Sequence, residues 1–210
     1  MVRLLIVDDH MVVRRGLIDI LRAGFPTAVF TEARDATEML EKVRQRNWSA
    51  VITDVTMPGR SGIDALRELK QTQPAVPVLV MSMHGEDQYA VRALKAGASG
   101  YVTKDKAAEE LVMALTRVLE GRKYVSTQLA ERLAGELTAP AGHLPHEQLS
   151  EREFQVLCSL AKARTIKEIA AELSLSVKTV STYHVRLLTK LGMTRDAELV
   201  RYAIDHRLVE

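Results

Sequence analysis

The chain has 210 residues and a mass of 23.4 kDa, and its 29 Lys and Arg residues nearly balance its 27 Asp and Glu residues. Hydrophobic residues make up 47% and charged residues 27%, which is typical of globular domains and excludes collagen, coiled coil and intrinsic disorder. The longest apolar runs, 4–7 and 76–81, are far shorter than the roughly 20 residues of a membrane span, so we expect no membrane segment. Met1 leads directly into a strand pattern with no secretion signal, which predicts a cytoplasmic protein.

The first 120 residues alternate short apolar runs with segments of helical period. Strands are expected at 2–7, 27–31, 50–53, 78–81 and 100–102, and helices at 10–23, 36–46, 62–71, 86–96 and 107–119. Strands that are separated by helices predict a parallel sheet with helices on both faces. The fold class of this half is therefore α/β, with five parallel strands.

No strand pattern follows residue 119. A helix is expected around 128–136, and the Pro- and Gly-containing stretch 138–145 is typical of a linker. Four short helices fit into 149–208, which predicts a small all-α domain. We therefore divide the chain into a first domain at 1–121, a partly helical linker at 122–147 and a second domain at 148–210.

Helix starts in the second domain are marked by side chains that cap helices. Two pairs have the spacing of a capping box, and two further residues sit where helices should begin: Ser150 with Glu153, Thr165 with Glu168, Ser176, and Thr194. The short joint around 174–176 between two of these helices predicts a helix-turn-helix.

Polar side chains gather at the predicted carboxyl ends of the strands. Asp8 and Asp9 end the first strand, Asp54 ends the third, Ser82 ends the fourth, and Lys104 closely follows the fifth. Ligands of open parallel sheets bind at this edge. Clustered carboxylates repel one another unless a cation is present, and oxygen-only ligands favour Mg²⁺. A hydroxyl and an ammonium beside them suit the oxygens of a phosphoryl group, so the pattern indicates phosphoryl transfer.

Two histidines flank this predicted site, but we expect neither to have a second ligand at metal spacing. We interpret His10 and His84 as loop residues. The sequence has neither a Gly-x-x-x-x-Gly-Lys-Ser loop nor a Gly-x-Gly-x-x-Gly loop, so a nucleotide site has little support.

The first 120 residues also carry the motifs of a known family. These are Asp8-Asp9, Asp54, Met57-Pro58-Gly59 with Gly62, Ser82, Ala96-Gly97-Ala98, and residues 101–104. In this combination the segment resembles the receiver domain of a bacterial two-component response regulator. The resemblance implies a flavodoxin-like (βα)5 fold and a sensor histidine kinase as partner.

The resemblance also implies roles for single residues. Asp54 would be the phosphoacceptor, and Asp9, Asp54 and the backbone carbonyl of Thr56 would bind Mg²⁺, with Asp8 acting mostly through water.

Three further roles concern the phosphoryl group itself. Ser82 and Lys104 would contact it, and Tyr101 would be the aromatic residue whose rotamer follows the movement of the hydroxyl.

In the second domain, the expected helix 177–191 has two chemically distinct faces. At 100° per residue, Val180, Leu187 and Leu191 fall on one side, with His184 and Leu188 at its flanks. The opposite side carries cations, hydroxyls and one valine: Lys178, Ser181, Thr182, Val185, Arg186 and Thr189. No acidic residue occurs in 173–195, so this face suits the major groove of DNA. A protein-docking module with a merely solvated helix is the alternative.

Residues 149–208 resemble the LuxR-type DNA-binding domain of the NarL/FixJ class. The matching segments are 149–153, 167–170, Ser176, 178–180 and 190–192. The resemblance implies that base edges are contacted by Ser181, Thr182 and Val185, and phosphates by Lys178, Thr179, Tyr183 and Lys190. We add Arg186 and Arg195 to the expected DNA contacts, because both lie in the segment 173–195 that has cations and no acidic residue. Two departures stand out, because Ala163 replaces the usual Gly and Tyr183 the usual His of the family.

Together the two domains predict a DNA-binding response regulator, not an enzyme, in which phosphorylation of Asp54 controls transcription. A homodimer that grips two half-sites on double-stranded DNA is expected from the family and from operator symmetry. The alternative is a regulator that works without phosphorylation and whose receiver is a dimerisation or protein-docking module. A phosphatase or phosphotransferase acting on metabolites lacks any substrate-pocket signature.

Overall fold

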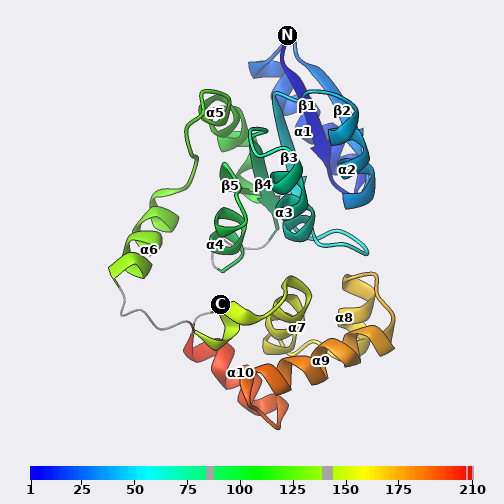
Figure 1. Cartoon of the computed structure of the whole chain (residues 1–210), viewed down its shortest axis with the longest axis vertical. Helices are drawn as coiled ribbons and strands as arrows, with labels where there is room; N and C mark the ends of the chain where they lie inside the picture. Colours follow the sequence, from blue (N-terminus) through cyan, green and yellow to red (C-terminus); the bar gives the residue numbers. More distant parts are fainter. Residues whose placement is uncertain (84–87, 139–143, 207, 210) are drawn as a thin grey trace. The chain divides into compact units, whose positions relative to one another are not determined.

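The computed structural model describes residues 1–83, 88–138, 144–206 and 208–209. The chain divides into two compact units, Met1–Leu137 and Thr138–Glu210 (Figure 1). None of the helices within the described ranges is long and apolar enough to cross a membrane.

The first unit is built on a five-stranded parallel sheet in the order β2-β1-β3-β4-β5. Its strands are β1 (Arg3–Val7), β2 (Val29–Ala33), β3 (Ala50–Asp54), β4 (Val78–Ser82) and β5 (Gly100–Thr103). Its helices are α1 (Met11–Gly24), α2 (Ala36–Gln45), α3 (Gly62–Thr72), α4 (Gln88–Lys95) and α5 (Ala107–Leu119), with a 3-10 turn η1 (Lys104–Lys106) after β5. The predicted α/β fold is confirmed.

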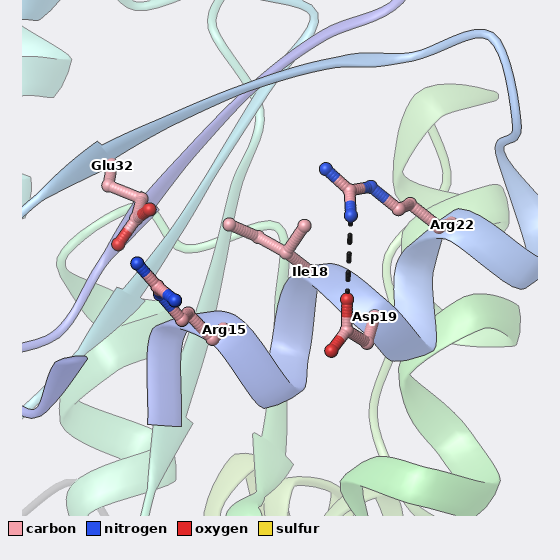
Figure 2. A pocket seen from close by; sticks show the side chains of 5 residues that line it. All are labelled: Arg15, Ile18, Asp19, Arg22 and Glu32. Carbon is pink, nitrogen blue, oxygen red and sulfur yellow. Dashed lines mark ion pairs between the residues drawn. The ribbon is translucent and has the colours of Figure 1, made fainter. Parts of the chain in front are cut away.

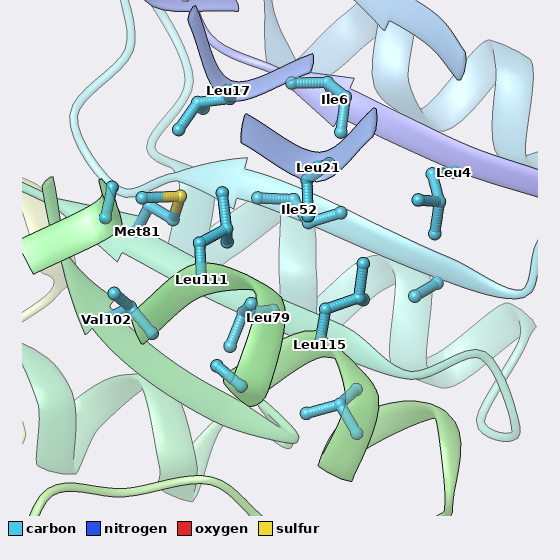
Figure 3. Packing of buried hydrophobic residues seen from close by; sticks show 14 of the residues in the cluster. Leu4, Ile6, Leu17, Leu21, Ile52, Leu79, Met81, Val102, Leu111 and Leu115 are labelled. Atoms are coloured by element: carbon cyan, nitrogen blue, oxygen red, sulfur yellow. The ribbon is translucent and has the colours of Figure 1, made fainter. Parts of the chain in front are cut away.

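Two helices cover one face of this sheet and bury a continuous core. Leucines of α1 and α5 pack onto side chains from four strands (Figure 3), and the labelled members are Leu4, Ile6, Leu17, Leu21, Ile52, Leu79, Met81, Val102, Leu111 and Leu115. On the other face α2 contacts β1, β2 and α3, and α3 contacts α4. Because both faces are covered, β3 and β4 are buried along their whole length, as their apolar sequences predict.

The element boundaries agree with prediction to within about two residues, with one informative shift. The second strand was expected at 27–31 but runs from Val29 to Ala33, because Glu32 and Ala33 pair with Ile6 and Val7 of β1. Residues 86 and 87 of the expected fourth helix lie outside the described residues.

A helix, α6 (Thr127–Thr138), follows the sheet, as the helical pattern at 128–136 predicts. Tyr124, just before it, is buried and forms a β-bridge to Gly100, a contact that the sequence pattern does not reveal. Residues 139–143, which make up most of the Pro- and Gly-containing stretch 138–145, lie outside the described residues.

The second unit is all-α, as predicted. It contains a 3-10 turn η2 (Pro145–Gln148) and the helices α7 (Glu151–Ala161), α8 (Ile166–Glu172), α9 (Val177–Leu191) and α10 (Asp196–Asp205). Helix α7 packs against α9 and α10, and α8 packs against α9. Each of the four helices contributes a side chain with no exposed area, namely Phe154, Ile169, Val180 and Leu199.

Three of the four predicted helix starts in this unit are confirmed. Capping boxes begin α7 at Ser150 and α8 at Thr165, and Ser176 caps α9 by accepting the N–H of Thr179. Thr194 was expected to begin the last helix, but this prediction is wrong, since Arg195 is the cap residue. The carboxylate of Glu198 accepts the backbone N–H groups of Thr194 at 2.8 Å and of Arg195 at 3.2 Å. Helix α10 therefore begins one residue later than predicted.

The backbone between α7 and α8 shows why the family usually has glycine where this chain has Ala163. Ala163 has φ +58°, in the left-handed region where a Cβ is strained and glycine is not. Glycine at this position therefore relieves backbone strain, and the chain carries that strain at Ala163.

Replacing Ala163 with Gly should raise the free energy of unfolding by about 1 kcal/mol, because the strain exceeds the entropy that glycine adds to the unfolded chain. Urea unfolding followed by circular dichroism, with amide exchange in α7 and α8, measures the change. Ala171→Gly is the matched control: it lies inside α8, where glycine should cost about 1 kcal/mol. Destabilisation by both variants would contradict the assignment of strain.

Candidate functional site

The carboxyl edge of the sheet brings together side chains from four neighbouring strands. Asp8 directly follows β1, Asp54 ends β3, Ser82 ends β4, and Lys104 directly follows β5. The strand registers align these ends, since each strand pairs in parallel with the next. β1 and β3 lie beside each other where the strand order reverses, which is the usual ligand position in such sheets.

Lys104 links the two most buried carboxylates. Its Nζ donates to Oδ2 of Asp8 at 2.5 Å and to Oδ2 of Asp54 at 2.7 Å. Asp8 is 1% exposed and Asp54 5% exposed, so both charges lie away from bulk water. The second oxygen of Asp54 accepts the backbone N–H of Thr56 at 3.2 Å. One ammonium therefore faces two carboxylates at this edge, which leaves an excess of negative charge.

Burial, together with this excess of negative charge, changes the protonation of the site. Burial raises the pKa of Asp54 to about 6, although the Lys104 ammonium opposes the rise, and the Asp8 carboxylate adds to it. Burial acts to lower the pKa of Lys104, but the two carboxylates outweigh it and the pKa is raised. An additional cation would therefore favour the ionised form of Asp54.

A second group of possible ligands lies at the start of α1. Within the described residues, Asp8, Asp9 and His10 form one cluster whose ligand atoms all lie within 4.8 Å of one another. His10 Nδ1 is 3.0 Å from Asp9 Oδ1. The expectation that His10 has no ligand partner is therefore wrong, because the chain turns into α1 at this residue. His84 lies outside the described residues.

Two buried polar atoms accompany the carboxylates. Asp9 Oδ1 and the hydroxyl of Thr56 are buried and form no hydrogen bond within the described part of the chain, since the nearby ring nitrogen of His10 makes none to Asp9 Oδ1. Buried polar atoms without a partner are costly and are expected where a ligand binds.

Gly62 allows the loop after β3 to close on the site. Its N–H donates to the carbonyl of Val55 at 2.9 Å, and a Cβ at this position would lie 1.9 Å from the carbonyl oxygen of Asp54. No side chain fits there, so glycine is required for α3 to begin beside Asp54.

Two more of the predicted residues are buried in the sheet. Ser82 and Tyr101 have no exposed area, and each has further interactions in the structure. Sequence reasoning missed Arg14, whose guanidinium donates to the carbonyl of Asp8 and to the carboxylate of Glu32, both at 2.7 Å. An arginine on an amphipathic helix gives no signal of such a role.

A surface hollow lies at α1 and β2 and has a different chemistry. It is lined by Arg15, Ile18, Asp19, Arg22 and Glu32, and Arg22 pairs with Asp19 at 3.5 Å (Figure 2). Opposite charges mixed in this way, with no hydroxyl or convergent carboxylates, do not suit phosphoryl chemistry.

In the second unit, α9 has the two faces that the sequence predicts. Val180 and Leu187 are fully buried. The predicted nucleic-acid face is exposed at each of its members, which are Lys178, Ser181, Thr182, Val185, Arg186 and Thr189. Neither Lys178 nor Arg186 forms an ion pair with any residue that the structure describes.

Other predicted contact residues are engaged inside the unit. Lys190 donates to the carboxylate of Glu153 at 2.6 Å, and the hydroxyl of Thr179 lies 2.8 Å from that of Ser176. Burial acts to raise the pKa of Glu153, but hydrogen bonds from Lys190 and Ser150 outweigh it and the pKa is lowered. Lys190 therefore has a structural partner that competes with any phosphate. Tyr183 is half-buried, and its role as a contact stays a prediction.

Comparison with known families finds a separate match for each half of the chain. Residues 4–116 match the response regulator receiver domain, and residues 147–203 match the luxR family of bacterial regulatory proteins. The chain belongs to the response regulators. It combines a receiver with a LuxR-type helix-turn-helix domain, the architecture of a DNA-binding two-component transcription regulator.

Similar proteins share this architecture over their full length. The chain is 37% identical over 211 residues to the response regulator GacA of Pseudomonas aeruginosa, covering 100% of this chain and 99% of GacA. It is 32% identical over 209 residues to UvrY of Escherichia coli, covering 99% and 96%. A structure of RcsB from Salmonella enterica serovar Typhimurium, bound to promoter rprA in the presence of phosphomimetic BeF₃⁻, has a TM-score of 0.63 at 26% identity and covers 96% of this chain and 98% of RcsB.

Replacing Gly62 with Ala should lower the free energy of unfolding by at least about 2 kcal/mol, because the new methyl group collides with the backbone of Asp54. Gly16→Ala is the control. It lies in α1 with no atom within 4 Å of the added Cβ, and should stabilise by about 0.5 to 1 kcal/mol. Urea unfolding measures both. Equal effects of the two variants would refute the steric role of Gly62.

Asp54→Asn should raise the free energy of unfolding of the EDTA-treated protein by about 2 to 3 kcal/mol at pH 7. The folded pKa lies above the unfolded value, so wild-type stability falls as pH rises from about 4 to about 6 and the Asn variant escapes that loss. Urea midpoints across this range measure the difference, which should vanish below pH 4. Asp19→Asn, at an exposed position, is the control. A difference that does not change with pH would contradict the raised pKa.

Proposed function

We propose that Asp54 accepts a phosphoryl group from a sensor histidine kinase and that this controls DNA binding by the second domain. The observation that carries the proposal is the buried carboxylate of Asp54 at the carboxyl edge, held by Lys104 beside Asp8. A carboxylate oxygen of Asp54 attacks the phosphorus of a phosphohistidine. The O–P bond forms as the N–P bond breaks, and the electron pair returns to the kinase imidazole.

Mg²⁺ is the cofactor that fits this edge. Asp9, Asp54 and the backbone carbonyl of Thr56 are the oxygen ligands we assign to it, with Asp8 acting mostly through water, and the buried Asp9 Oδ1, which accepts no hydrogen bond among the described residues, supports the fit. The ion would supply the positive charge that lets the carboxylates and the incoming phosphate approach one another.

Lys104 and Ser82 are the residues that respond to phosphorylation. The ammonium already lies 2.7 Å from the phosphoacceptor and is placed to bind a phosphoryl oxygen. Ser82, from the adjacent strand, offers a hydroxyl to a second oxygen. Tyr101, buried in the next strand, would change its packing as Ser82 moves.

The second domain would bind double-stranded DNA through α9. Base edges would be contacted by Ser181, Thr182 and Val185, and phosphates by Lys178, Thr179, Tyr183, Arg186 and Lys190. The exposure of Lys178 and Arg186, with no acidic partner among the described residues, supports this assignment. A homodimer reading two half-sites is proposed for the active form.

The functional division we propose is a receiver at 1–121, a connector at 122–147 and a DNA-binding domain at 148–210. The protein would act in the cytoplasm, as a regulator and not as an enzyme. The alternative, a receiver that serves only for docking or dimerisation, does not explain why Lys104 is buried between two carboxylates.

The phosphoacceptor is tested with acetyl phosphate as donor. With Mg²⁺, intact-mass measurement should show one phosphoryl adduct on the wild type and none on Asp54→Asn, while EDTA suppresses the adduct. Asp64→Asn, a nearby partly exposed carboxylate paired with Arg67, should keep it. An adduct that persists in Asp54→Asn would overturn the assignment, and no adduct in any condition would favour the docking alternative.

The DNA interface is tested by comparing two lysines of α9. Lys178→Ala should weaken binding to every duplex and reduce the slope of log affinity against log salt by about one, since one phosphate contact is lost. Lys190→Ala should also weaken DNA binding but, unlike Lys178→Ala, should lower stability as well, because it leaves the carboxylate of Glu153 buried without its ammonium. Fluorescence anisotropy and urea unfolding separate the two effects. An unchanged salt slope in Lys178→Ala would contradict the interface.

A further inference from the structure

The exposed face of α9 differs in chemistry from what its hydroxyl-rich sequence suggests. Three of its members, Ser181, Thr182 and Thr189, carry hydroxyl groups, which as free groups can both donate and accept hydrogen bonds. Between them lies Val185, an apolar side chain that is 61% exposed. The helix is therefore not simply a polar reader.

Each of these hydroxyls is already used as a donor within the helix. Ser181 Oγ donates to the carbonyl of Val177 at 2.9 Å, and Thr182 Oγ1 to that of Lys178 at 3.0 Å. Thr189 Oγ1 donates to the carbonyl of Val185 at 2.9 Å. A carbonyl carries no hydrogen, so the hydroxyl must supply it, and each hydroxyl has only one. Beyond the helix the three side chains offer lone pairs and, in threonine, a methyl group.

The bases present different partners in the major groove. Guanine offers two acceptors there, whereas adenine and cytosine offer an amino donor, and thymine offers an acceptor and a methyl group. A hydroxyl without a free hydrogen cannot bind the acceptors of guanine, but it can accept from adenine or cytosine. An exposed valine gains most by burying itself against a thymine methyl.

We propose that Val185 determines sequence specificity by packing on the methyl group of a thymine, with Ser181 and Thr182 serving as acceptors for amino groups of neighbouring bases. The inference rests on the proposed DNA-binding function and assigns to it a class of site, half-sites with thymine opposite the middle of α9. Lys178 and Arg186 remain exposed cations on this face and bind phosphates rather than bases.

The experiment uses the full-length protein treated with acetyl phosphate and Mg²⁺. Duplexes are first selected from a random library, and each thymine of the selected half-site is then replaced in turn by uracil, which differs only by the methyl group. At one position the replacement should weaken wild-type binding about fourfold for each half-site, the effect of losing one buried methyl. In Val185→Ala the same replacement should change affinity less than twofold.

Val177→Ala is the matched control. This valine is 47% exposed at the first position of the same helix, about two turns before Val185, so it cannot contact the same base pair and its variant should keep the wild-type response to uracil. Both substitutions are at exposed positions, and circular dichroism checks that each variant is folded.

The outcomes distinguish the role of Val185 from DNA binding itself. Selected duplexes that bind with no thymine dependence, or a uracil effect that persists in Val185→Ala, would overturn the role of Val185 and leave DNA binding standing. Failure to enrich any duplex, at low as well as moderate salt, would overturn the proposed function and this inference with it.

Discussion

The receiver depends on one electrostatic constraint: carboxylates must be held together, out of water, at the edge of a buried sheet. Asp8 and Asp54 are almost completely buried, and Lys104 hydrogen bonds to both. One ammonium cannot compensate both carboxylates and the nearby Asp9, so the site remains short of positive charge. Burial raises the pKa of Asp54, the Asp8 carboxylate adds to the rise, and the deficit of positive charge favours a cation at the edge. It also makes the site respond strongly to any change in its charge, which a switch requires.

Three features of the receiver hold this edge of the sheet in place. Parallel pairing aligns the strand ends, the core formed with α1 and α5 fixes the sheet, and Gly62 lets α3 begin against the backbone of Asp54. The second domain positions its functional residues on one helix instead of at a sheet edge. Its capped helices hold α9 by one buried face and leave the other exposed, where helix-bonded hydroxyls surround Val185. The carboxylate site and the exposed face of α9 are thus carried by separate compact units.

The sequence predicts most of the fold and the members of the site, because strand period, helix period and strand-end carboxylates are local signals. It could not reveal contacts that depend on the folded backbone. The bridge from Tyr124 to Gly100, the hydrogen bond from Arg14 to Asp8 and the proximity of His10 to Asp9 join residues through the path of the chain. Pairing also decides the true limits of β2, where strand propensity alone was two residues out. The left-handed backbone at Ala163 became visible only with its φ angle.

The most direct test of the account is the coupling between the two domains. One duplex is titrated by fluorescence anisotropy with the wild-type protein before and after phosphorylation, and with Asp54→Asn treated identically. Phosphorylation should tighten wild-type binding by about tenfold, a typical coupling between sites, and should leave the affinity of Asp54→Asn unchanged. Equal affinities of the phosphorylated and unphosphorylated wild type would contradict a phosphorylation switch, even if Asp54 were fully modified.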